Sequence, residues 1–428
     1  MIKMSSYQRP KGTADILPGT TEIWQYVEDT ARSVFKRYQY HEIRTPIFES
    51  ADVFARTSGE TSDVVSKEMY AFEDKGGRMM ALRPEGTAGV VRAYIENKLY
   101  GPEFSKPYKV YYAGPMFRYE RPQSGRQRQF TQLGVEAFGS DSPALDAETI
   151  ALARELIASF GAKGLKIVIN TLGDPETRKA YHEALVNYLK SFESELSNDS
   201  KIRLEKNPLR VLDSKDKHDQ EIVANAPSIL DYLTPAAQDH FNQVQGFLTA
   251  LGIDFEIDAT MVRGLDYYNH TIFEVMTNDP AFGGGYTTVI GGGRYNGLAE
   301  ELGGPETPGV GFGLGLERLM MLVADKKFDT PLPLYIVAID AAAQKTALSL
   351  ATAIRHQGTA VNLDFMNRKA KAQFKTANKE DAQFVATIGD NELADGTVQV
   401  KKMATGEQKT FKQADLLNDF DAVKANFD

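Results

Sequence analysis

The stretch FRYERPQSGRQRQFTQLGVEAFG, residues 117–139, decides how the first half of the chain folds. Apolar and polar residues alternate on both sides of its centre, in VYYAGPMFRYE and in RQFTQLGVEAF, whereas the centre RPQSGRQ has the composition of a turn. Because successive side chains of a strand point to opposite faces, this pattern predicts a long β-hairpin. One face of the hairpin is then predicted to pack a core with Leu133, Val135 and Ala137.

The opposite face of this hairpin is the first candidate for a ligand site. It carries Gln132 and Glu136 between Phe130 and Phe138, and Arg118 and Glu120 share one face of the other strand. Charged and amide side chains between aromatic ones, on a sheet whose other face is buried, are typical of a ligand floor. The alternative is a solvated outer face. The hairpin also gathers positive charge in a chain of net charge −9, at Arg118, Arg121, Arg126 and Arg128.

Length and composition limit the class of protein. A chain of 428 residues predicts two or three domains, and 42% hydrophobic residues with mixed charge are typical of a soluble globular protein. The chain has no cysteine, which excludes disulfides, thiolate zinc sites and a cysteine nucleophile, and which fits the cytoplasm. The six histidines lack metal-ligand spacing, so no metal site is expected. The sequence contains no signal-peptide core and no apolar run long enough for a membrane span.

Breaks in composition predict the domain organisation. Residues 1–325 are expected to form one domain, and the helix-rich, highly charged residues 171–258 are expected to be an insertion within it. The charged, proline-containing segment around 326–330 is the predicted linker. Residues 331–428 alternate between strand and helix patterns, which predicts a small α/β domain with a mostly parallel sheet.

Near the N-terminus, the apolar spacing predicts a helix over residues 21–38. The segment HEIRTPIFE that follows is predicted to be a strand. Pro46 cannot donate to a β-ladder, so this strand is expected at an edge or an interface.

GVGFGLGLERLMM, residues 309–321, predicts a strand with one bare face followed by a helix. Glycine at every second position from Gly309 to Gly315 would let a flat ligand lie directly on the backbone. Arg318 falls in the first turn of the helix, where the helix dipole disfavours a cation, and an anionic ligand such as a phosphate would offset that cost. The alternative is a neighbouring element packed on the glycines, with Arg318 paired to a carboxylate. Neither a dinucleotide fingerprint nor a P-loop is present.

Three further motifs are candidates for walls of a pocket. MVRGLDYYNHTIFEV places Arg263, Tyr267 and Tyr268 just before a predicted strand, with a structural ion pair between Arg263 and Asp266 as the alternative role. GGGRYNGL, residues 291–298, predicts a close approach of the backbone to another group. LRPEGTA places Glu85 and Thr87 at a strand-to-helix turn, where Thr87 taken alone is predicted to be a helix N-cap.

Together these motifs resemble those of the class II aminoacyl-tRNA synthetases. The hairpin resembles motif 2 of the class, GVGFGLGLERLMM resembles motif 3, and the first helix with EIRTPIFE resembles motif 1, except that Gln39 stands where glycine is common. RGLDYYNHTIFEV and GGGRYNGL resemble the two signatures of the histidyl-tRNA synthetase family, and the similarity covers essentially the whole chain.

The resemblance implies an α+β fold and a two-step reaction. The expected architecture is an antiparallel catalytic sheet flanked by helices, a helical insertion and a C-terminal anticodon-binding α/β domain. The implied enzyme is a cytoplasmic homodimer that uses ATP and Mg²⁺ to form histidyl-adenylate from L-histidine, then transfers the histidine to tRNA(His).

The resemblance also implies roles for individual residues. Arg118 would hold the α-phosphate of ATP and Arg318 the γ-phosphate, with Glu120 and Arg126 as further ATP contacts. Arg263 would contact the α-phosphate and the histidine carboxylate, which makes Arg263 and Arg118 the implied catalytic residues.

The implied histidine site draws on several elements. Its residues are Glu85, Thr87 and Gln132 at the amino group, Glu136 and Tyr268 at the imidazole, and also Tyr267. Gln123 and Arg128 are the candidates for contacting the tRNA acceptor end. No protein metal site is implied.

Two other functions are compatible with parts of the pattern. A histidine-sensing regulatory paralogue of ATP phosphoribosyltransferase shares the core fold, but such chains usually lack the anticodon domain and have a degraded histidine signature. A binding module with a dead active site would have lost at least one phosphate-holding arginine. Both the domain and the arginines are present, so the synthetase is the predicted function.

Overall fold

The computed structural model describes residues 7–59, 62, 64–123, 125–328 and 331–427. The chain divides into two compact units, Met1–Lys326 and Lys327–Asp428. Of the predicted linker 326–330, residues 329 and 330 lie outside the described residues.

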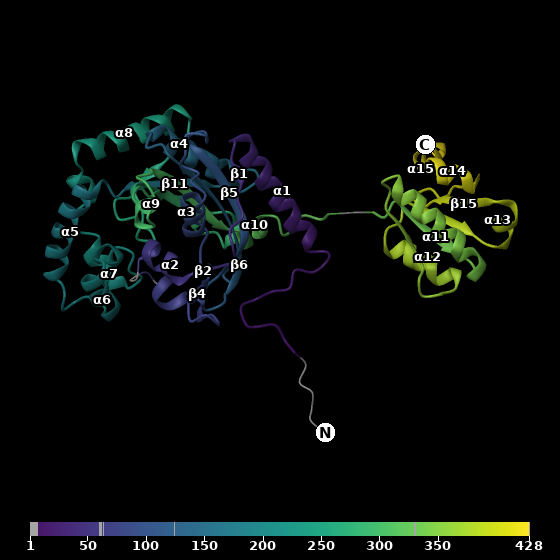
Figure 1. The fold of residues 1–428 in the computed structure, drawn as a ribbon, viewed down its shortest axis with the longest axis horizontal. Coiled ribbons are helices and arrows are strands. Elements are labelled where there is room, and N and C mark those ends of the chain that lie inside the picture. Colours follow the sequence, from purple (N-terminus) through teal and green to yellow (C-terminus); the bar gives the residue numbers. More distant parts are fainter. Residues whose placement is uncertain (1–6, 60–61, 63, 124, 329–330, 428) are drawn as a thin grey trace, which may run out of the picture. The chain divides into compact units, whose positions relative to one another are not determined.

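An eight-stranded sheet forms the centre of the first unit (Figure 1). The predicted hairpin is confirmed, because its two strands pair antiparallel from Phe117↔Gln129 to Tyr108↔Phe138. The sheet is antiparallel except at its short edge strands, which pair parallel to their neighbours. Its strands, in spatial order, are β1 (His41–Glu42), β5 (Tyr108–Phe117), β6 (Gln129–Phe138), β11 (Gly309–Gly315), β10 (Thr287–Arg294), β9 (Asn269–Thr277), β7 (Leu165–Thr171) and β8 (Glu256–Ile257).

The single strand predicted for HEIRTPIFE is wrong. The segment forms β1 and, beyond Pro46, a separate strand in a three-stranded sheet ordered β2 (Phe48–Ser50), β4 (Met79–Leu82) and β3 (Ala71–Glu73). Pro46 has no N–H group to donate to a β-ladder, so the strand is interrupted at this residue. The side chain of Arg83 stabilises the backbone at the interruption. The Arg83 Nη1 donates to the carbonyl oxygens of Thr45 at 2.9 Å and Pro46 at 3.4 Å.

One face of the large sheet carries the main apolar core. The core side of the hairpin is as predicted, with Leu133, Val135 and Ala137 at most 2% exposed. The first helix is confirmed within one residue of its predicted end, and Gln39, just beyond it, has a φ of 62°. This left-handed conformation is the reason that glycine suits that position. The helices that contribute to this core include α1 (Thr21–Arg37), α4 (Pro143–Ala158), α8 (Pro235–Ala250) and α10 (Leu316–Leu322).

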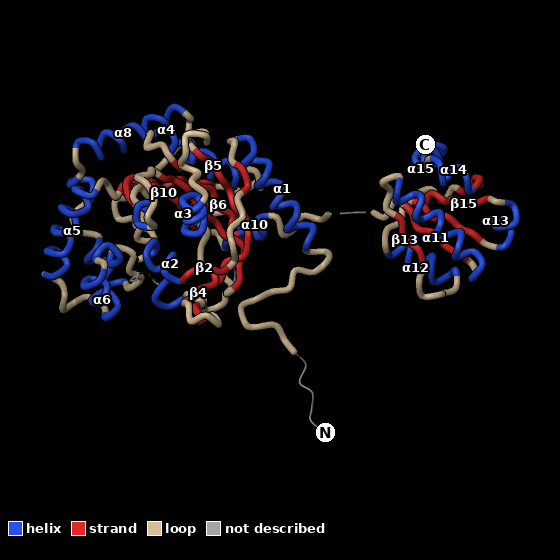
Figure 2. Tube along the Cα trace, viewed as in Figure 1, coloured by secondary structure: helices blue, strands red, loops and turns tan. Residues whose placement is uncertain are grey.

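A second core lies between the sheet and the helices that follow β4 and β7. Between β7 and β8 the chain is helical, as the charged and apolar pattern of that segment predicts. In Figure 2, α5 and α6 of this helical segment lie beside the large sheet, on the left of the view. The remaining elements of the first unit are α2 (Ala51–Ser58), η1 (Val64–Glu68), α3 (Thr87–Glu96), α5 (Pro175–Lys190), α6 (Asn198–Lys206), η2 (Pro208–Val211), α7 (Lys217–Val223), η3 (Ile229–Tyr232), η4 (Pro280–Phe282) and α9 (Leu298–Glu301).

The second unit has a five-stranded sheet with helices around it. Only half of its pairings are parallel: β13–β12 and β12–β14 are parallel, but β14–β15 and β15–β16 are antiparallel. The predicted mostly parallel sheet therefore needs correction. The strand β16 has the polar sequence QKTFK, which gives little apolar alternation to detect.

The elements of this second unit are the strands β12 (Leu334–Ala338), β13 (Val361–Leu363), β14 (Phe384–Ile388), β15 (Thr397–Lys402) and β16 (Gln408–Lys412), with α11 (Ala341–His356), α12 (Ala370–Lys379), α13 (Asp390–Asp395), α14 (Gln413–Asn418), α15 (Phe420–Lys424) and η5 (Ala425–Phe427).

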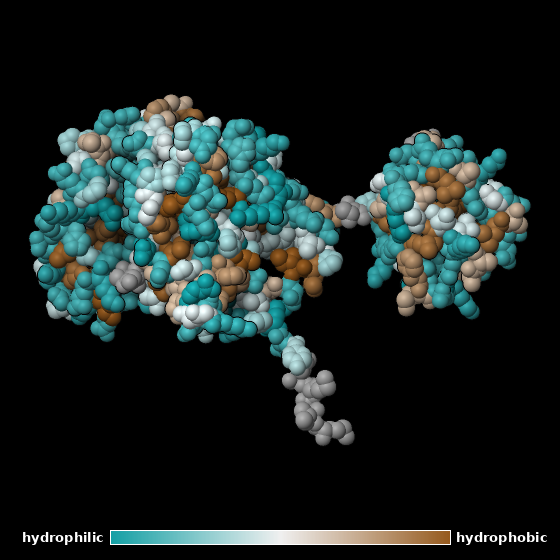
Figure 3. All heavy atoms as spheres, viewed as in Figure 1, coloured by the Kyte–Doolittle hydropathy of each residue, from teal (hydrophilic) through white to brown (hydrophobic). Residues whose placement is uncertain are grey.

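Hydrophilic residues dominate the face of each unit seen in Figure 3. Among the residues that the structure describes, every helix is too short or too polar to serve as a membrane span.

Candidate active site

A cavity of about 340 Å³ opens on the sheet face opposite the main core. Strands β6, β10 and β11 contribute to its floor, and the segments before α3 and β9 contribute to its walls. The structure thereby brings together residues from Val64 to Arg318, which are 254 positions apart in the chain. The predicted site residues that line it are Glu85, Thr87, Arg118, Arg126, Gln132, Arg263, Tyr267, Tyr268 and Arg318.

Glycines make room for side chains that cross the floor. A Cβ added at Gly291 would lie 1.8 Å from Nη2 of Arg263, so only glycine fits beneath that guanidinium. On β11, a Cβ at Gly311 would lie 2.1 Å from Oε2 of Glu136. The prediction that the whole glycine row faces a flat ligand is therefore wrong. Neighbouring side chains cover Gly309 and Gly311, and only Gly313 and Gly315 line the cavity.

Three arginines gather at one end of the cavity. The Arg118 Nε donates to the Pro84 carbonyl at 2.8 Å, and the guanidinium lies 5.3 Å from the centre of the Phe130 ring. Arg126 is 48% exposed and lies 3.6 Å from Glu120. Among the described residues, Arg118 and Arg318 form no ion pair with a carboxylate. A group of cations with so little compensating charge favours an anionic ligand.

Arg318 is the most constrained of these cations. It lies in the first turn of α10, as predicted, and its Nη1 donates to the Thr288 carbonyl. Burial lowers the pKa of Arg318, and the positive charge of Arg126 lowers it further. The alternative role, in which a carboxylate neutralises Arg318, is not what the described part of the chain shows, because Arg318 donates there to the neutral carbonyl of Thr288.

Arg263 lies in the wall of the cavity and is paired with Glu274 on β9. The predicted alternative partner, Asp266, instead accepts a hydrogen bond from Asn207 at 3.0 Å. The Arg263 Nε is buried and has no hydrogen-bond partner among the described residues. One donor of this guanidinium is thus held by the protein, and another remains for a ligand.

Glu85 and Thr87 lie at the start of α3. The side chain that accepts hydrogen bonds from the first N–H groups of this helix is that of Glu85 and not that of Thr87. The predicted N-cap role of Thr87 is wrong, because Gly86 is the N-cap residue and Thr87 is already helical. Glu85 accepts hydrogen bonds at 2.7 Å from the backbone N–H groups of both Thr87 and Ala88. A carboxylate at a helix N-terminus satisfies free N–H groups and interacts favourably with the helix dipole. Burial nevertheless raises the pKa of Glu85.

Glu136 lies below the cavity floor and does not line the cavity. Its two oxygens accept hydrogen bonds from the Thr87 hydroxyl at 2.7 Å and from the Tyr295 hydroxyl at 2.5 Å. Burial raises the pKa of Glu136 to about 8, although these two hydroxyls lower it. Glu136 therefore holds the floor together in this structure, and a ligand reaches it only by replacing one of its partners.

Aromatic side chains surround this polar centre. The rings of Tyr267 and Tyr268 are buried with their centres 4.6 Å apart, and burial raises the pKa of Tyr268 to about 12. Both phenols are therefore neutral hydrogen-bonding groups near pH 7. Tyr112 also lines the cavity, where Gly86 and Gly134 leave space for its ring. Gln132 completes this end by accepting a hydrogen bond from the Gly86 N–H at 3.0 Å.

The predicted residues Glu120, Gln123 and Arg128 lie outside the cavity lining. They belong to the loop that joins β5 and β6. Gln123 and Arg126 form an isolated bridge across this loop, and the Arg128 Nε donates to the Glu120 carbonyl at 3.1 Å. The described residues of the loop therefore bond to one another beside the arginine end of the cavity.

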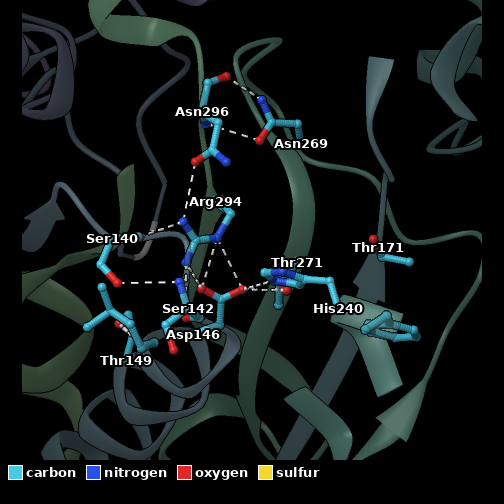
Figure 4. A network of polar contacts seen from close by, with 12 residues as sticks. Ser140, Ser142, Asp146, Thr149, Thr171, His240, Asn269, Thr271, Arg294 and Asn296 are labelled. Atoms are coloured by element: carbon cyan, nitrogen blue, oxygen red, sulfur yellow. Dashed lines mark hydrogen bonds and ion pairs between the residues drawn. The ribbon is translucent and has the colours of Figure 1, made fainter. Parts of the chain in front are cut away.

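A buried ion pair joins α4 to the end of β10 (Figure 4). Asp146 on α4 binds the guanidinium of Arg294, and both side chains are fully buried. Asp146 also bonds His240 at 2.8 Å and the Thr271 hydroxyl at 2.7 Å. Charge on Arg294 and hydrogen bonds lower the pKa of Asp146 in spite of its burial. This network ties α4, α8, β9 and β10 together directly beside Tyr295.

Within the described part of the chain, no group of three or more His, Cys, Asp or Glu side chains could hold a metal ion.

Comparison with known proteins identifies the family. The histidyl-tRNA synthetase family matches residues 12–319, and an anticodon-binding domain family matches residues 334–422. The chain belongs to the histidyl-tRNA synthetase family. It is 69% identical to the histidine–tRNA ligase of Lacticaseibacillus casei (strain BL23) and 62% identical to that of Levilactobacillus brevis, in each case over 98% of both chains.

The fold agrees with a solved structure of the same family. The apo histidyl-tRNA synthetase of S. aureus superposes with a TM-score of 0.82 at 42% identity, covering 96% of this chain and 99% of that one. The predicted α+β fold, with an antiparallel sheet and a C-terminal anticodon-binding domain, is confirmed. The full-length similarity to histidine–tRNA ligases favours the synthetase over the regulatory paralogue.

Sequence reasoning missed three members of the site. All three lie inside motifs of the sequence: Tyr112 in VYYAGPMFRYE, Glu274 in MVRGLDYYNHTIFEV and Tyr295 in GGGRYNGL. Membership in a motif was the only signal. Their roles follow from contacts between separate segments, such as Glu274 with Arg263 and Tyr295 with Glu136.

Proposed function

We propose that the chain is a histidine–tRNA ligase whose cavity holds ATP at its arginine end and L-histidine at its tyrosine end. The reaction joins the histidine carboxylate to the α-phosphorus of ATP, releases pyrophosphate, and then passes the histidyl group to tRNA(His) with release of AMP. Family membership supports the reaction, and one observation supports the placement. Arg118 and Arg318, which have no carboxylate partner among the described residues, share one cavity of about 340 Å³ with buried neutral hydrogen-bonding groups.

The arginine end fits a triphosphate. Arg118 is the proposed partner of the α-phosphate and Arg318 of the γ-phosphate, with Glu120 and Arg126 as additional ATP contacts. The ion pair of Arg126 with Glu120, at 3.6 Å, is long enough for a phosphate to displace it at little cost. ATP arrives as its complex with Mg²⁺, which neutralises part of the phosphate charge and belongs to the substrate.

Arg263 is placed to act on the charge that develops during adenylation. Its guanidinium lies in the wall between the two ends, and its buried Nε lacks a protein partner among the described residues. A fixed donor in a site shielded from water stabilises a developing negative charge without reorganisation. Glu274 fixes the orientation of Arg263, and Thr288 in turn donates to Glu274 at 2.5 Å.

The tyrosine end fits the amino acid. Glu85, Thr87 and Gln132 are the proposed partners of the amino group, and Tyr267 and Tyr268 enclose the side chain. Glu136 is proposed to meet the imidazole when histidine takes the place of one of its hydroxyl partners. The imidazole can supply the lost hydrogen bond, whereas a side chain without such a group would leave Glu136 buried and unpaired.

The partners of the enzyme are proposed on separate grounds. A homodimer is supported by the three-stranded sheet, which exposes apolar side chains, with Phe48 57%, Phe72 44% and Met79 52% accessible. Gln123 and Arg128, on the loop beside the arginine end, are the proposed contacts of the tRNA acceptor end. The second unit is proposed to bind the anticodon, and the enzyme to work in the cytoplasm.

Histidine-dependent exchange of labelled pyrophosphate into ATP tests the first step. We expect exchange with histidine alone among the amino acids, and exchange with a different amino acid would refute the assignment.

A chain that ends at Asp325 tests the role of the second unit. It retains all cavity residues, so we expect it to keep measurable exchange but to charge tRNA poorly. Charging at the rate of the full chain would contradict the anticodon role.

A further inference from the structure

The segment before the first helix contains a tight turn that rests on the β5–β6 loop. The Thr13 N–H donates to the Pro10 carbonyl at 3.2 Å, and the Thr13 hydroxyl donates to the same carbonyl at 2.8 Å. Gly12, the third residue of this turn, has a φ of 85°. This is the position of a type II turn that requires a positive φ, which explains why the turn contains glycine.

Gly12 contacts the base of the loop at the point where β6 begins. Its carbonyl accepts hydrogen bonds from the backbone N–H of Arg128 at 2.7 Å and of Gln129 at 3.2 Å. The contact is also close in space, because a Cβ at Gly12 would lie 2.7 Å from Cγ and 2.9 Å from Cβ of Arg128. Any side chain at Gly12 would push the two segments apart.

The contact continues from Gly12 to the arginine end of the cavity. The Arg128 carbonyl accepts from the Arg118 N–H at 2.9 Å, which closes the loop at its base. The Arg128 guanidinium lies 3.8 Å from the centre of the Tyr119 ring, so the same residue also packs on the opposite side of the loop. Arg128 therefore contacts both ends of the loop, and its own N–H group donates to the Gly12 carbonyl.

We infer that the turn Pro10–Thr13 is a clamp that positions Arg118 and Arg126 for the phosphates, with Gly12 as its positioning residue. This inference rests on the proposed ATP site. Among the described residues, the hydrogen bonds of the clamp reach Arg128 and Gln129 at the start of β6 and none of the residues of the tyrosine end, which lie at the start of α3, in the segment before β9 and in the middle of β5 and β6. Loosening the clamp therefore acts on ATP and leaves histidine binding intact.

The test compares Gly12→Ala with Gly19→Ala. Gly19 lies in the same segment with a φ of 93°, but a Cβ there would meet nothing within 4 Å. Both variants thus introduce backbone strain, and only Gly12→Ala disturbs the loop. We expect Gly12→Ala to raise the KM for ATP in pyrophosphate exchange by about tenfold while the KM for histidine changes by less than about twofold. Gly19→Ala should match the wild type in both values.

A second readout does not depend on activity. Trypsin cleaves after Arg126 and Arg128 only when the loop leaves its place, so cleavage there, followed by mass spectrometry, reports on the clamp directly. We expect faster cleavage in Gly12→Ala than in the wild type or Gly19→Ala. Equal cleavage in all three proteins, or an equal rise of both KM values, would overturn the clamp. Absence of exchange in the wild type would refute the proposed function, and the cleavage rates would still decide the clamp.

Discussion

The two ends of the cavity differ in how far the protein satisfies its own polar groups. At the tyrosine end, Glu136 accepts from Thr87 and Tyr295, and Glu85 accepts from two backbone N–H groups. At the arginine end, Arg318 has a carbonyl oxygen as its partner and a second cation nearby. The first end is complete without a ligand, whereas the second is completed by the anion that it binds.

This difference indicates how each substrate is selected. Histidine must replace hydrogen bonds that already exist, so a poorly matched side chain leaves buried groups unpaired and is rejected. The phosphates of ATP bring negative charge to a group of arginines with excess positive charge. ATP binding therefore depends more on electrostatic attraction than on replacing existing hydrogen bonds one for one. Specificity is therefore expected from the tyrosine end, and phosphate binding from the arginine end.

Arg263 lies between the two ends, and its removal is expected to have the largest effect. Arg263→Ala should lower pyrophosphate exchange by about a thousandfold, because a fixed donor to the developing charge is lost. Arg263→Lys, which keeps the charge but not the guanidinium geometry, should recover only part of this loss. Thermal unfolding of both variants serves as the control for folding. Exchange within a few-fold of the wild type would mean that Arg263 is only the ion-pair partner of Glu274.

The free energy of unfolding should respond differently at Arg294, which has a carboxylate partner, and at Arg318, which has none among the described residues. Asp146→Asn leaves the buried guanidinium of Arg294 without its carboxylate, and we expect the free energy of unfolding to fall by about 3 to 5 kcal/mol. Arg318→Met removes a cation that has no carboxylate partner among the described residues, so it should change stability by less than about 1 kcal/mol. Urea unfolding of the two variants measures the contrast. A comparable loss in both would show that the arginine end is as fully compensated as the buried pair.

The pH dependence of the free energy of unfolding tests the titration of Glu136, which belongs to the tyrosine end. The pKa of Glu136 is about 8 in the folded chain and 4.5 in its ordinary state, so the folded chain holds the proton more tightly. Stability from this group is then present at low pH and is lost as the pH rises toward 8. Between pH 6 and pH 8 the wild type should lose about 2 kcal/mol more than Glu136→Gln, which does not titrate. Parallel pH profiles would show that Glu136 is ionised throughout that range.

Most of the architecture could be predicted because it rests on local patterns. The alternation in the hairpin identified its pairing and its core face, and the motifs located the residues that line the cavity. The break at Pro46 and the polar strand β16 were missed, since both depend on tertiary partners such as Arg83 and β15. The sequence also could not tell that Glu136 lies under the floor. That depends on Tyr295, which directly follows β10, and β10 is not a neighbour of β6, the strand of Glu136, in the sheet.

The central claim is that the two ends of the cavity serve different substrates, and paired KM measurements test it most directly. Pyrophosphate exchange is measured at varied histidine and at varied ATP for Glu136→Ala and Arg318→Ala. We predict that Glu136→Ala raises the KM for histidine by about tenfold or more and that Arg318→Ala does the same for ATP, each with a much smaller change for the other substrate. Equal changes for both substrates in either variant would contradict the account.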